Sequence, residues 1–508
     1  MKRKFVILIV LYLALLCAPV IYGYTIAGNQ QVFNGLAFNP IDGNSYLAKM
    51  QLGYQGEWKF TLSYSPEPGQ GAYIFLYYIF LGHISRILYI PIILMYHIAR
   101  IAGALCLALA LILWIKKIIK NPAVQIAAGC LLLFGSGMGW LLLGFGVIST
   151  DMWVAEAYPF LSGLANPHFP LGLALLLWIL YVYSLPSTWK RNTLLFDLTL
   201  VLSIVLPFAI VLVAMIIVSV EVWNWFTQRK FHLVKLTFTL IGGGAYLLYQ
   251  FFSIQNDPML AQWNLQNITK APEIYDFLVS FSPSLVLAGV AVWRNRKASG
   301  FFSDNIPLIA WIAGGIILLY FPFDLQRRFL SGYFIPVVLI GFYLLDQLKS
   351  QSQKKPAALV IGIVGASLIT NLIVLAGIFT GLKSYDPHFF LTRDEAEAIS
   401  WMDASAADPE VVLSSPSLGS FIPARADLKV VYGHPYESIQ AEVREEKITQ
   451  FYTGAFAGAD VKAWLREMNI HFVVFGPREL AIGSNPDLSF LIPVQQFGEV
   501  QIFRVADE

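Results

Sequence analysis

Charged residues are scarce in this chain. Only 13% of its 508 residues are Asp, Glu, Lys or Arg, and 57% are hydrophobic. Soluble domains carry about 25% charged residues. Together with a mean hydropathy of +0.63, this shortage argues against a wholly soluble protein and predicts that most of the chain lies in lipid. The formal net charge of +2 is too small to indicate nucleic acid as a partner.

Cysteine is also rare. Cys17, Cys106 and Cys130 all lie in apolar stretches, so no disulfide framework is expected, and we predict that they pack as small apolar side chains. The chain also lacks a Gly-rich loop followed by Lys and Ser or Thr. This absence removes the usual motif for binding nucleotide phosphates.

Long apolar runs, in contrast, are abundant. A membrane-spanning helix needs roughly 20 mostly apolar residues. The first run is longer than the apolar core of a signal peptide, so we expect an uncleaved first span with a cytoplasmic N-terminus. We predict about eleven spans in all, near 5–24, 96–115, 122–148, 169–184, 194–206, 208–226, 233–253, 274–293, 305–322, 330–347 and 357–381.

Basic residues recur at alternate junctions between these spans. Cytoplasmic loops carry the excess of Lys and Arg. The apolar run 193–225 keeps the basic junctions on alternate sides only if it forms two spans that break at Pro207. Proline removes a helix hydrogen bond at that position. The loops 25–95, 149–168, 254–273 and 323–329 and the tail after 381 then lie outside. The basic junction residues are Lys116, Lys117, Lys120, Lys190, Arg191, Arg229, Lys230, Lys235, Arg294, Arg296, Lys297, Lys349, Lys354 and Lys355.

The last part of the chain has a different pattern. Helix and strand signals alternate there, which predicts a small α/β domain. We expect a mainly α fold: a transmembrane bundle over 1–381, with a first outer loop at 25–95, and an extracytoplasmic α/β domain over 382–508. We expect an integral, multi-pass protein of the plasma (inner) membrane. The predicted tail helices are 392–404, 436–452 and 460–468, and the first of them opens with Thr392-Arg393-Asp394-Glu395, which is typical of a helix cap. The predicted strands are 411–413, 429–432 and 471–475, followed by a hairpin over 494–505 that turns at 498–499. In the first outer loop, 71–91 is predicted to form an interfacial helix.

Asp42 is the first candidate for chemistry. It lies in the first outer loop, in a segment that also holds Tyr46 and Lys49. A carboxylate there can act as the base that deprotonates an acceptor hydroxyl, and Tyr46 can stack on a sugar. The alternative is a turn, because Asp before Gly43 is common in turns.

Other acidic side chains lie in the same predicted outer loops. Glu67 is held between two prolines, either in a site wall or as a solvated loop carboxylate. Asp151, Glu156 and His168 lie in the second long loop and either bind the acceptor or, with Asp42, hold a divalent cation such as Mg²⁺ or Mn²⁺. Their spacing matches no tight metal motif, and an interfacial role for His168 is the simpler reading.

Two adjacent arginines, Arg327 and Arg328, lie in a predicted outer loop, against the usual charge bias. The guanidinium fork suits a lipid phosphate or pyrophosphate. Arg100, near the outer end of a span, is a second candidate because a charge there is costly unless paired or functional. The alternative is that these side chains only anchor the protein to ordinary headgroups.

These features together resemble the GT-C superfamily of membrane glycosyltransferases, which includes protein O-mannosyltransferases and aminoarabinose transferases. The residues that carry the resemblance are Asp-x-x-x-Tyr-Leu-Ala-Lys at 42–49, Glu67-Pro68, the Asp151 loop and 326–330. It implies that Asp42 is the base or acceptor-binding group, that Asp151 or Glu156 is the second-loop acid, and that Arg327 and Arg328 hold the donor phosphate. Many relatives have paired acids in the first loop, whereas Gly43 follows Asp42 here, which leaves metal dependence open.

The leading hypothesis is an inverting transfer from a polyprenyl-phosphate sugar to a lipid, glycan or protein hydroxyl at the outer face of the cell envelope. Lys49, Tyr46, Glu67 and His168 would contact substrate. The rival hypotheses are a transporter or flippase of lipid-linked glycans and a non-catalytic assembly protein. Transporters place ionisable groups at mid-membrane, whereas here the polar groups cluster in predicted outer loops. The glycosyltransferase hypothesis requires that acidic side chains such as Asp42 and Asp151 and arginines such as Arg327 line one cavity at the outer face.

Overall fold

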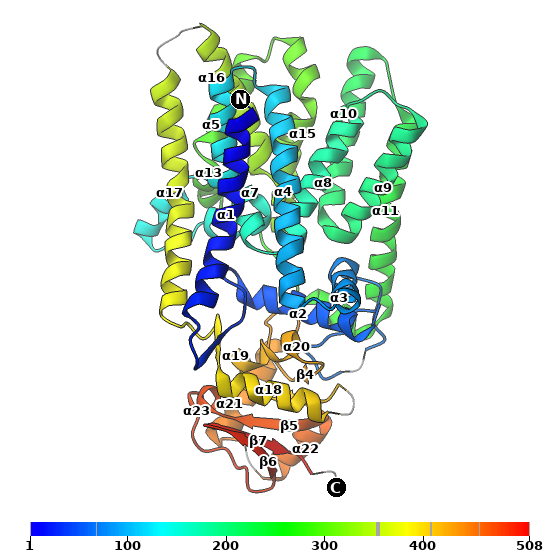
Figure 1. The fold of residues 1–508 in the computed structure, drawn as a ribbon. Helices are drawn as coiled ribbons and strands as arrows, with labels where there is room; N and C mark the ends of the chain where they lie inside the picture. Colours follow the sequence, from blue (N-terminus) through cyan, green and yellow to red (C-terminus); the bar gives the residue numbers. More distant parts are fainter. Residues whose placement is uncertain (1, 68, 352–355, 407–408, 457, 507–508) are drawn as a thin grey trace. The chain divides into compact units, whose positions relative to one another are not determined.

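The computed structural model describes residues 2–67, 69–351, 356–406, 409–456 and 458–506. The chain divides into two compact units (Figure 1). Unit 1 comprises 1–19, 97–249 and 268–378, and unit 2 comprises 20–96, 250–267 and 379–508.

Every stretch predicted to span the membrane contains a helix, but not every one is a straight span. Among the described residues, six helices are long and apolar enough to cross a membrane, or up to eight if each bent pair counts as one span. The expected eleven spans are therefore not confirmed. The helices are α1 (Lys2–Ile26), α4 (Ile92–Ile118), α5 (Pro122–Phe134), α8 (His168–Tyr183), α9 (Trp189–Val205), α10 (Phe208–Gln228), α11 (Leu233–Asn256), α13 (Ile274–Phe281), α14 (Ser284–Arg294), α15 (Ser299–Tyr320), α16 (Phe334–Gln351) and α17 (Pro356–Lys383).

Bends and short helices both lower the number: two predicted spans are bent helix pairs, and α8 and α9 have only 16 and 17 residues. The pair α5 and η1 (Gly139–Phe145) bends by 44°, and the pair α13 and α14 bends by 84°. The predicted break at Pro207 is confirmed, since α9 ends at Val205 and α10 begins at Phe208. Proline lacks the backbone N–H that would continue the helix.

The described parts of the predicted cytoplasmic junctions gather at one end of unit 1, the upper end in Figure 1. Lys354 and Lys355 lie outside the described residues. Lys117 Nζ donates to Ser184 Oγ at 3.0 Å, Lys235 Nζ donates to the Leu185 carbonyl at 2.8 Å, and Asn295 bonds Gln347. Alternate junctions thus share one end of the bundle, as the distribution of basic residues predicts.

The sheet of unit 2 has strand order β4-β3-β5-β7-β6. The strands are β3 (Val411–Leu413), β4 (Lys429–Val430), β5 (Ile470–Phe475), β6 (Ile492–Phe497) and β7 (Val500–Arg504). β3 runs parallel to β4 and β5, and β7 runs antiparallel to β5 and β6. The predicted hairpin is confirmed, with Gly498 at φ +50° in its turn.

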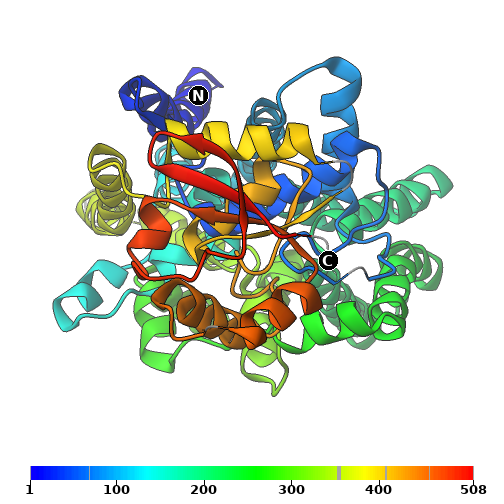
Figure 2. The ribbon, with the colours of Figure 1, turned by 90° about the horizontal axis from the view of Figure 1, so that it is seen from below.

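Helices cover both faces of this sheet (Figure 2, α18 in yellow, α21 and α22 in orange). Val412 packs with α18 (Arg393–Ser405) and α20 (Ile422–Arg425). Its neighbours in the strand face α21 (Ala441–Thr453) and α22 (Ala459–Glu467). The predicted cap of α18 is present as a reciprocal pair between Thr392 and Glu395.

The first predicted outer loop belongs to the same compact unit as the tail. β1 (Gln31–Phe33) pairs antiparallel with β2 (Phe390–Thr392). Ala48 and Tyr64 are part of the hydrophobic core that includes tail residues such as Val412. The loop also contains α2 (Pro40–Gln55) and α3 (Leu76–Leu88), and α3 falls within the predicted helix at 71–91. Unit 2 is therefore wider than the predicted domain 382–508.

Candidate functional site

Asp42 lies in the first turn of α2, in a helix rather than a turn. Asn39 precedes the helix with φ +48°, and Pro40 occupies its first position, where a missing N–H costs nothing. An acidic side chain in this turn interacts favourably with the helix dipole. Asn39 Nδ2 donates to Asp42 Oδ2 at 2.5 Å, so one carboxylate oxygen has a fixed donor.

The second carboxylate oxygen faces a histidine from the tail. Asp42 Oδ1 lies 3.3 Å from His434 Nε2. The Tyr436 N–H donates to His434 Nδ1 at 3.1 Å, so the ring proton belongs on Nε2 and points to Asp42. The Asp42 side chain is 46% exposed, whereas that of His434 is only 5% exposed. A buried imidazole therefore orients a carboxylate that solvent and ligands can reach.

A buried ion pair lies one to two turns further along the same face of α2. Positions 42, 45 and 49 share this face. Lys49 Nζ lies 2.5 Å from Glu437 Oε1 and donates to Ser45 Oγ at 2.6 Å, and Ser45 Oγ donates to Glu437 at 2.5 Å. Burial lowers the pKa of Lys49, and the Glu437 carboxylate opposes that shift. The Lys49 side chain is only 1% exposed, so its ammonium group pairs with Glu437 inside the protein and does not face solvent.

Tyr46 and Glu67 also have partners within unit 2. The Tyr46 ring stacks on Tyr78 with 4.3 Å between centroids. Glu67 forms an ion pair with Arg444, whose Nη1 also donates to Ser65 Oγ at 3.0 Å. Glu67 thus ties the irregular part of the first outer loop to helix α21.

In unit 1, the two predicted phosphate-binding arginines meet one carboxylate. Both lie in η3 (Gln326–Leu330). Arg328 Nη1 is 3.4 Å and Arg327 Nε is 4.0 Å from Glu156 Oε1. The Arg327 guanidinium also lies over the Trp153 ring, 4.4 Å from its centroid. Two guanidiniums share the Glu156 carboxylate, and the side chains of Arg327 and Arg328 remain 22% and 25% exposed.

Asp151 is surrounded by donors. Its Oδ2 accepts from the Ser136 hydroxyl and from the Gly137 and Gly139 N–H groups at 3.0–3.1 Å. Its Oδ1 accepts from Ser149 Oγ at 2.7 Å. The residue is 0% exposed. This arrangement holds the loop together and leaves little capacity to bind a substrate or a metal ion.

Arg100 and His168 are both buried in unit 1. Arg100 donates to the Gly163 carbonyl at 2.8 Å and to the Leu16 carbonyl at 3.2 Å. Its guanidinium therefore joins α1 to α7 (Pro159–Leu164). His168 begins α8, with its ring 4.0 Å from that of Phe169. The Arg100 contacts hold two helices of unit 1 together.

A metal ion does not fit the predicted ligands. Among the described residues, no three His, Cys, Asp or Glu side chains are grouped so that they could hold one. The Asp151 oxygens are already occupied by hydroxyl and backbone donors. Asp42 accepts from Asn39 and faces a protonated imidazole nitrogen. We therefore derive no step through a metal.

Sequence reasoning missed His434 and Glu437. Both residues precede α21, which begins at Ala441. The predicted helix 436–452 therefore starts too early and includes Glu437. They contact α2 across 392 and 388 positions of the chain. No pattern of neighbouring residues predicts contacts between such distant positions. The one indication is Lys49 itself, because a lysine on a partly apolar helix face implies a buried partner.

Comparisons with known proteins identify solved structures with a similar fold. No protein-family model matches the sequence, and no curated protein matches it. The solved structure of ArnT from Cupriavidus metallidurans bound to undecaprenyl phosphate is similar, with TM-score 0.52 and 10% identity over 98% of this chain and 99% of that one.

Two larger proteins are similar as well. The apo oligosaccharyltransferase of Archaeoglobus fulgidus aligns with TM-score 0.56 and 11% identity over 95% of this chain and 71% of that one. The arabinofuranosyltransferase AftD from Mycobacteria aligns with TM-score 0.56 and 13% identity over 100% of this chain and 40% of that one. At such low identity the likeness establishes the fold, and the chain has the fold of the GT-C membrane glycosyltransferases.

Proposed function

We propose that this protein is a membrane glycosyltransferase that moves a sugar from a polyprenyl-phosphate donor to an acceptor hydroxyl, with inversion at the anomeric carbon. The observation that carries the proposal is the state of Asp42. Its carboxylate is 46% exposed, while Asn39 and His434 hold both of its oxygens in a fixed orientation. A base that is both accessible and oriented suits proton abstraction from a hydroxyl.

The proposed reaction has one covalent step. The Asp42 carboxylate takes the proton of the acceptor hydroxyl as the acceptor oxygen bonds to the anomeric carbon. The bond between that carbon and the phosphate oxygen breaks, and the electron pair leaves on polyprenyl phosphate. A single displacement of this kind inverts the configuration at the anomeric carbon.

Arg327 and Arg328 are proposed to stabilise the departing phosphate. Guanidinium groups bind phosphate oxygens through charge-assisted hydrogen bonds. The Glu156 carboxylate lies beside both guanidiniums and keeps both side chains in place. Positive charge held where negative charge develops lowers the barrier of such a transfer.

Related solved structures support this class of substrate. ArnT was solved bound to undecaprenyl phosphate, and the archaeal oligosaccharyltransferase was solved with a dolichol-phosphate and an inhibitory peptide. For this chain the sugar and the acceptor stay open among lipid, glycan and protein hydroxyls. We propose an extracytoplasmic reaction because the basic junctions at one end of unit 1 are typical of the cytoplasmic side, and Asp42, Arg327 and Arg328 lie in the intervening loops of the chain.

Under this proposal, Asp151 and Arg100 are structural rather than catalytic. The donors around Asp151 fix the loop that carries Glu156. Lys49 stabilises α2 through its ion pair with Glu437 and does not contact the substrate. Glu67 stabilises the first outer loop through its ion pair with Arg444. Tyr46 and His168 remain proposed substrate contacts without a demonstrated ligand.

The test is a reconstituted assay that separates transfer from transport. Purified protein in liposomes receives decaprenyl-phosphate donors labelled in the sugar, with mannose and arabinose donors tested separately. The proposal predicts release of unlabelled decaprenyl phosphate and labelled product when membrane extract supplies acceptors. Movement of intact labelled donor across the bilayer, without cleavage, would contradict it and favour a flippase.

A further inference from the structure

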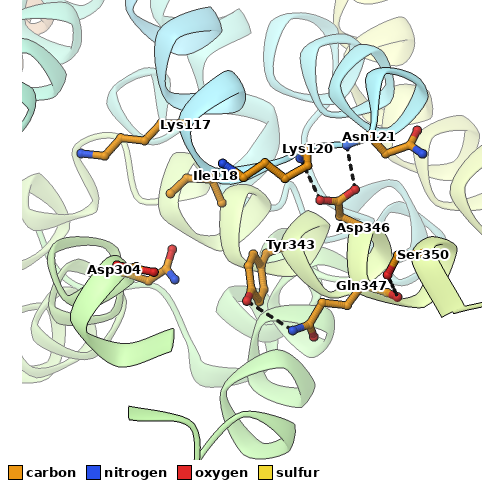
Figure 3. Close-up of a pocket in the computed structure, with 10 residues that line it drawn as sticks. Lys117, Ile118, Lys120, Asn121, Asp304, Tyr343, Asp346, Gln347 and Ser350 are labelled. Carbon is orange, nitrogen blue, oxygen red and sulfur yellow. Dashed lines mark hydrogen bonds between the residues drawn. The ribbon is translucent and has the colours of Figure 1, made fainter. Parts of the chain in front are cut away.

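A polar cavity of about 790 Å³ lies in unit 1, beside the basic junctions (Figure 3). The end of α4, the first turns of α15 and the last turns of α16 line it. Its charged lining residues are Lys117, Lys120, Asp304 and Asp346. Two cations and two anions give the lining no net charge, so it suits a ligand that carries both signs.

Two of these four charges already have partners. The N–H groups of Lys120 and Asn121 donate to Asp346 at 2.8 and 2.9 Å (Figure 3). Lys117 Nζ donates to Ser184 Oγ. Within the described ranges, the Lys120 ammonium and the Asp304 carboxylate have no hydrogen bond or ion pair, and Asp304 interacts with Lys117 only through the longer-range attraction of opposite charges. They are therefore the charges that a ligand can meet.

Asn305 supplies an independent sign that a ligand belongs here. The residue is 3% exposed and lines the cavity. Its Nδ2 donates to the Phe301 carbonyl at 2.9 Å, but its Oδ1 is buried with no hydrogen-bond partner among the described residues. An unsatisfied buried acceptor is costly, so the occupant should present an N–H or O–H group to it.

We propose that this cavity binds the headgroup of an ethanolamine phospholipid, with the phosphate at Lys120 and the ammonium between Asp304 and Asn305 Oδ1. A choline headgroup has no N–H to donate to Asn305. An anionic glycerol headgroup offers no cation to Asp304. Polar pockets at the ends of spanning helices lie at the depth of lipid headgroups. The inference does not depend on glycosyl transfer.

Native mass spectrometry of the full-length protein tests the proposal. Delipidated protein is mixed with equal amounts of phosphatidylethanolamine, phosphatidylcholine and phosphatidylglycerol with identical acyl chains. We expect the ethanolamine lipid to be retained about tenfold over the choline lipid, the effect of one satisfied buried acceptor. Equal retention of these two lipids, or preference for the glycerol lipid, would overturn the proposal.

Variants locate the preference within the cavity. Asn305→Leu and Lys120→Gln should each reduce the preference to near unity. The matched control is Lys116→Gln, because Lys116 lies over the Phe5 ring, 5.4 Å from its centroid, and it should keep the preference. Preference that survives both cavity variants contradicts the proposal. If either variant fails to fold, the headgroup comparison on the unaltered protein still decides.

A soluble probe separates the lipid from a free headgroup. O-phosphoethanolamine at millimolar concentration should compete with the phospholipid, whereas phosphocholine should not. Binding of the soluble compound to protein that retains no phospholipid would assign the cavity to a free metabolite and overturn the lipid proposal.

Discussion

Arg327 and Arg328 both face the Glu156 carboxylate, so either can be replaced without leaving that carboxylate unpaired. If they hold the donor phosphate, Arg327→Gln and Arg328→Gln should each lower kcat/KM for the donor. The loss of a hydrogen bond to a charged group predicts a decrease of about 10- to 100-fold. Initial rates at varied donor concentration measure it. Arg296→Gln, at an exposed junction, is the control, and rates equal to that control would refute the assignment.

The buried pair of Lys49 and Glu437 predicts a stability effect of its own. Lys49→Met leaves the Glu437 charge buried and unpaired, which costs about 3–5 kcal/mol. The double variant Lys49→Met with Glu437→Gln should recover part of this loss because no buried charge remains. Denaturant unfolding measures both. A single variant as stable as the unaltered chain would show that the pair is not buried as described.

The same pair predicts how stability depends on pH. Burial raises the pKa of Glu437, but the Lys49 ammonium outweighs this and holds the pKa below its ordinary value of 4.5. The carboxylate therefore contributes stability above 4.5 that is lost as the pH falls through the lower folded-state pKa. Glu437→Gln should make the acid limb of a thermal-midpoint curve shallower, and an unchanged limb would argue against this linkage.

At the scale of elements, α2 and α3 approach through two glycines. A Cβ on Gly53 would lie 2.0 Å from the Ile79 carbonyl oxygen, and one on Gly82 would lie 2.0 Å from that of Met50. Gly53→Ala should therefore force the helices apart and cost about 1–3 kcal/mol. Gly289→Ala, where nothing lies within 4 Å, is the control. Equal thermal midpoints for the two variants would contradict this packing.

Local patterns predicted those elements that depend on near neighbours. The pair of Thr392 and Glu395, the break at Pro207 and the turn at Gly498 each involve a few residues, and all three are confirmed. The number of spans could not be predicted, because hydropathy does not report bends such as the 84° one between α13 and α14. The partners of α2 could not be predicted because they lie in the tail.

At the scale of the whole molecule, the first outer loop and the tail share one core. Ala48 and Tyr64 pack with Leu391 and Val412. A chain that ends at 381 should therefore expose the loop 25–95 even though that loop is intact. Limited proteolysis of the truncated and full-length proteins measures this, with cleavage between 56 and 75 expected to be much faster in the truncated form. Equal cleavage rates would show that the loop folds without the tail.

The central claim is that Asp42 is the base of a glycosyl transfer, and turnover of Asp42→Asn tests it most directly. Asp386→Asn is the matched control, because Asp386 also pairs with a histidine, His388 at 2.8 Å, in the same unit. Loss of a general base predicts a decrease in kcat of about 10²- to 10⁴-fold, with a thermal midpoint unchanged and with the Asp386 variant fully active. An Asp42→Asn protein that transfers sugar at the rate of the Asp386 variant would contradict the account.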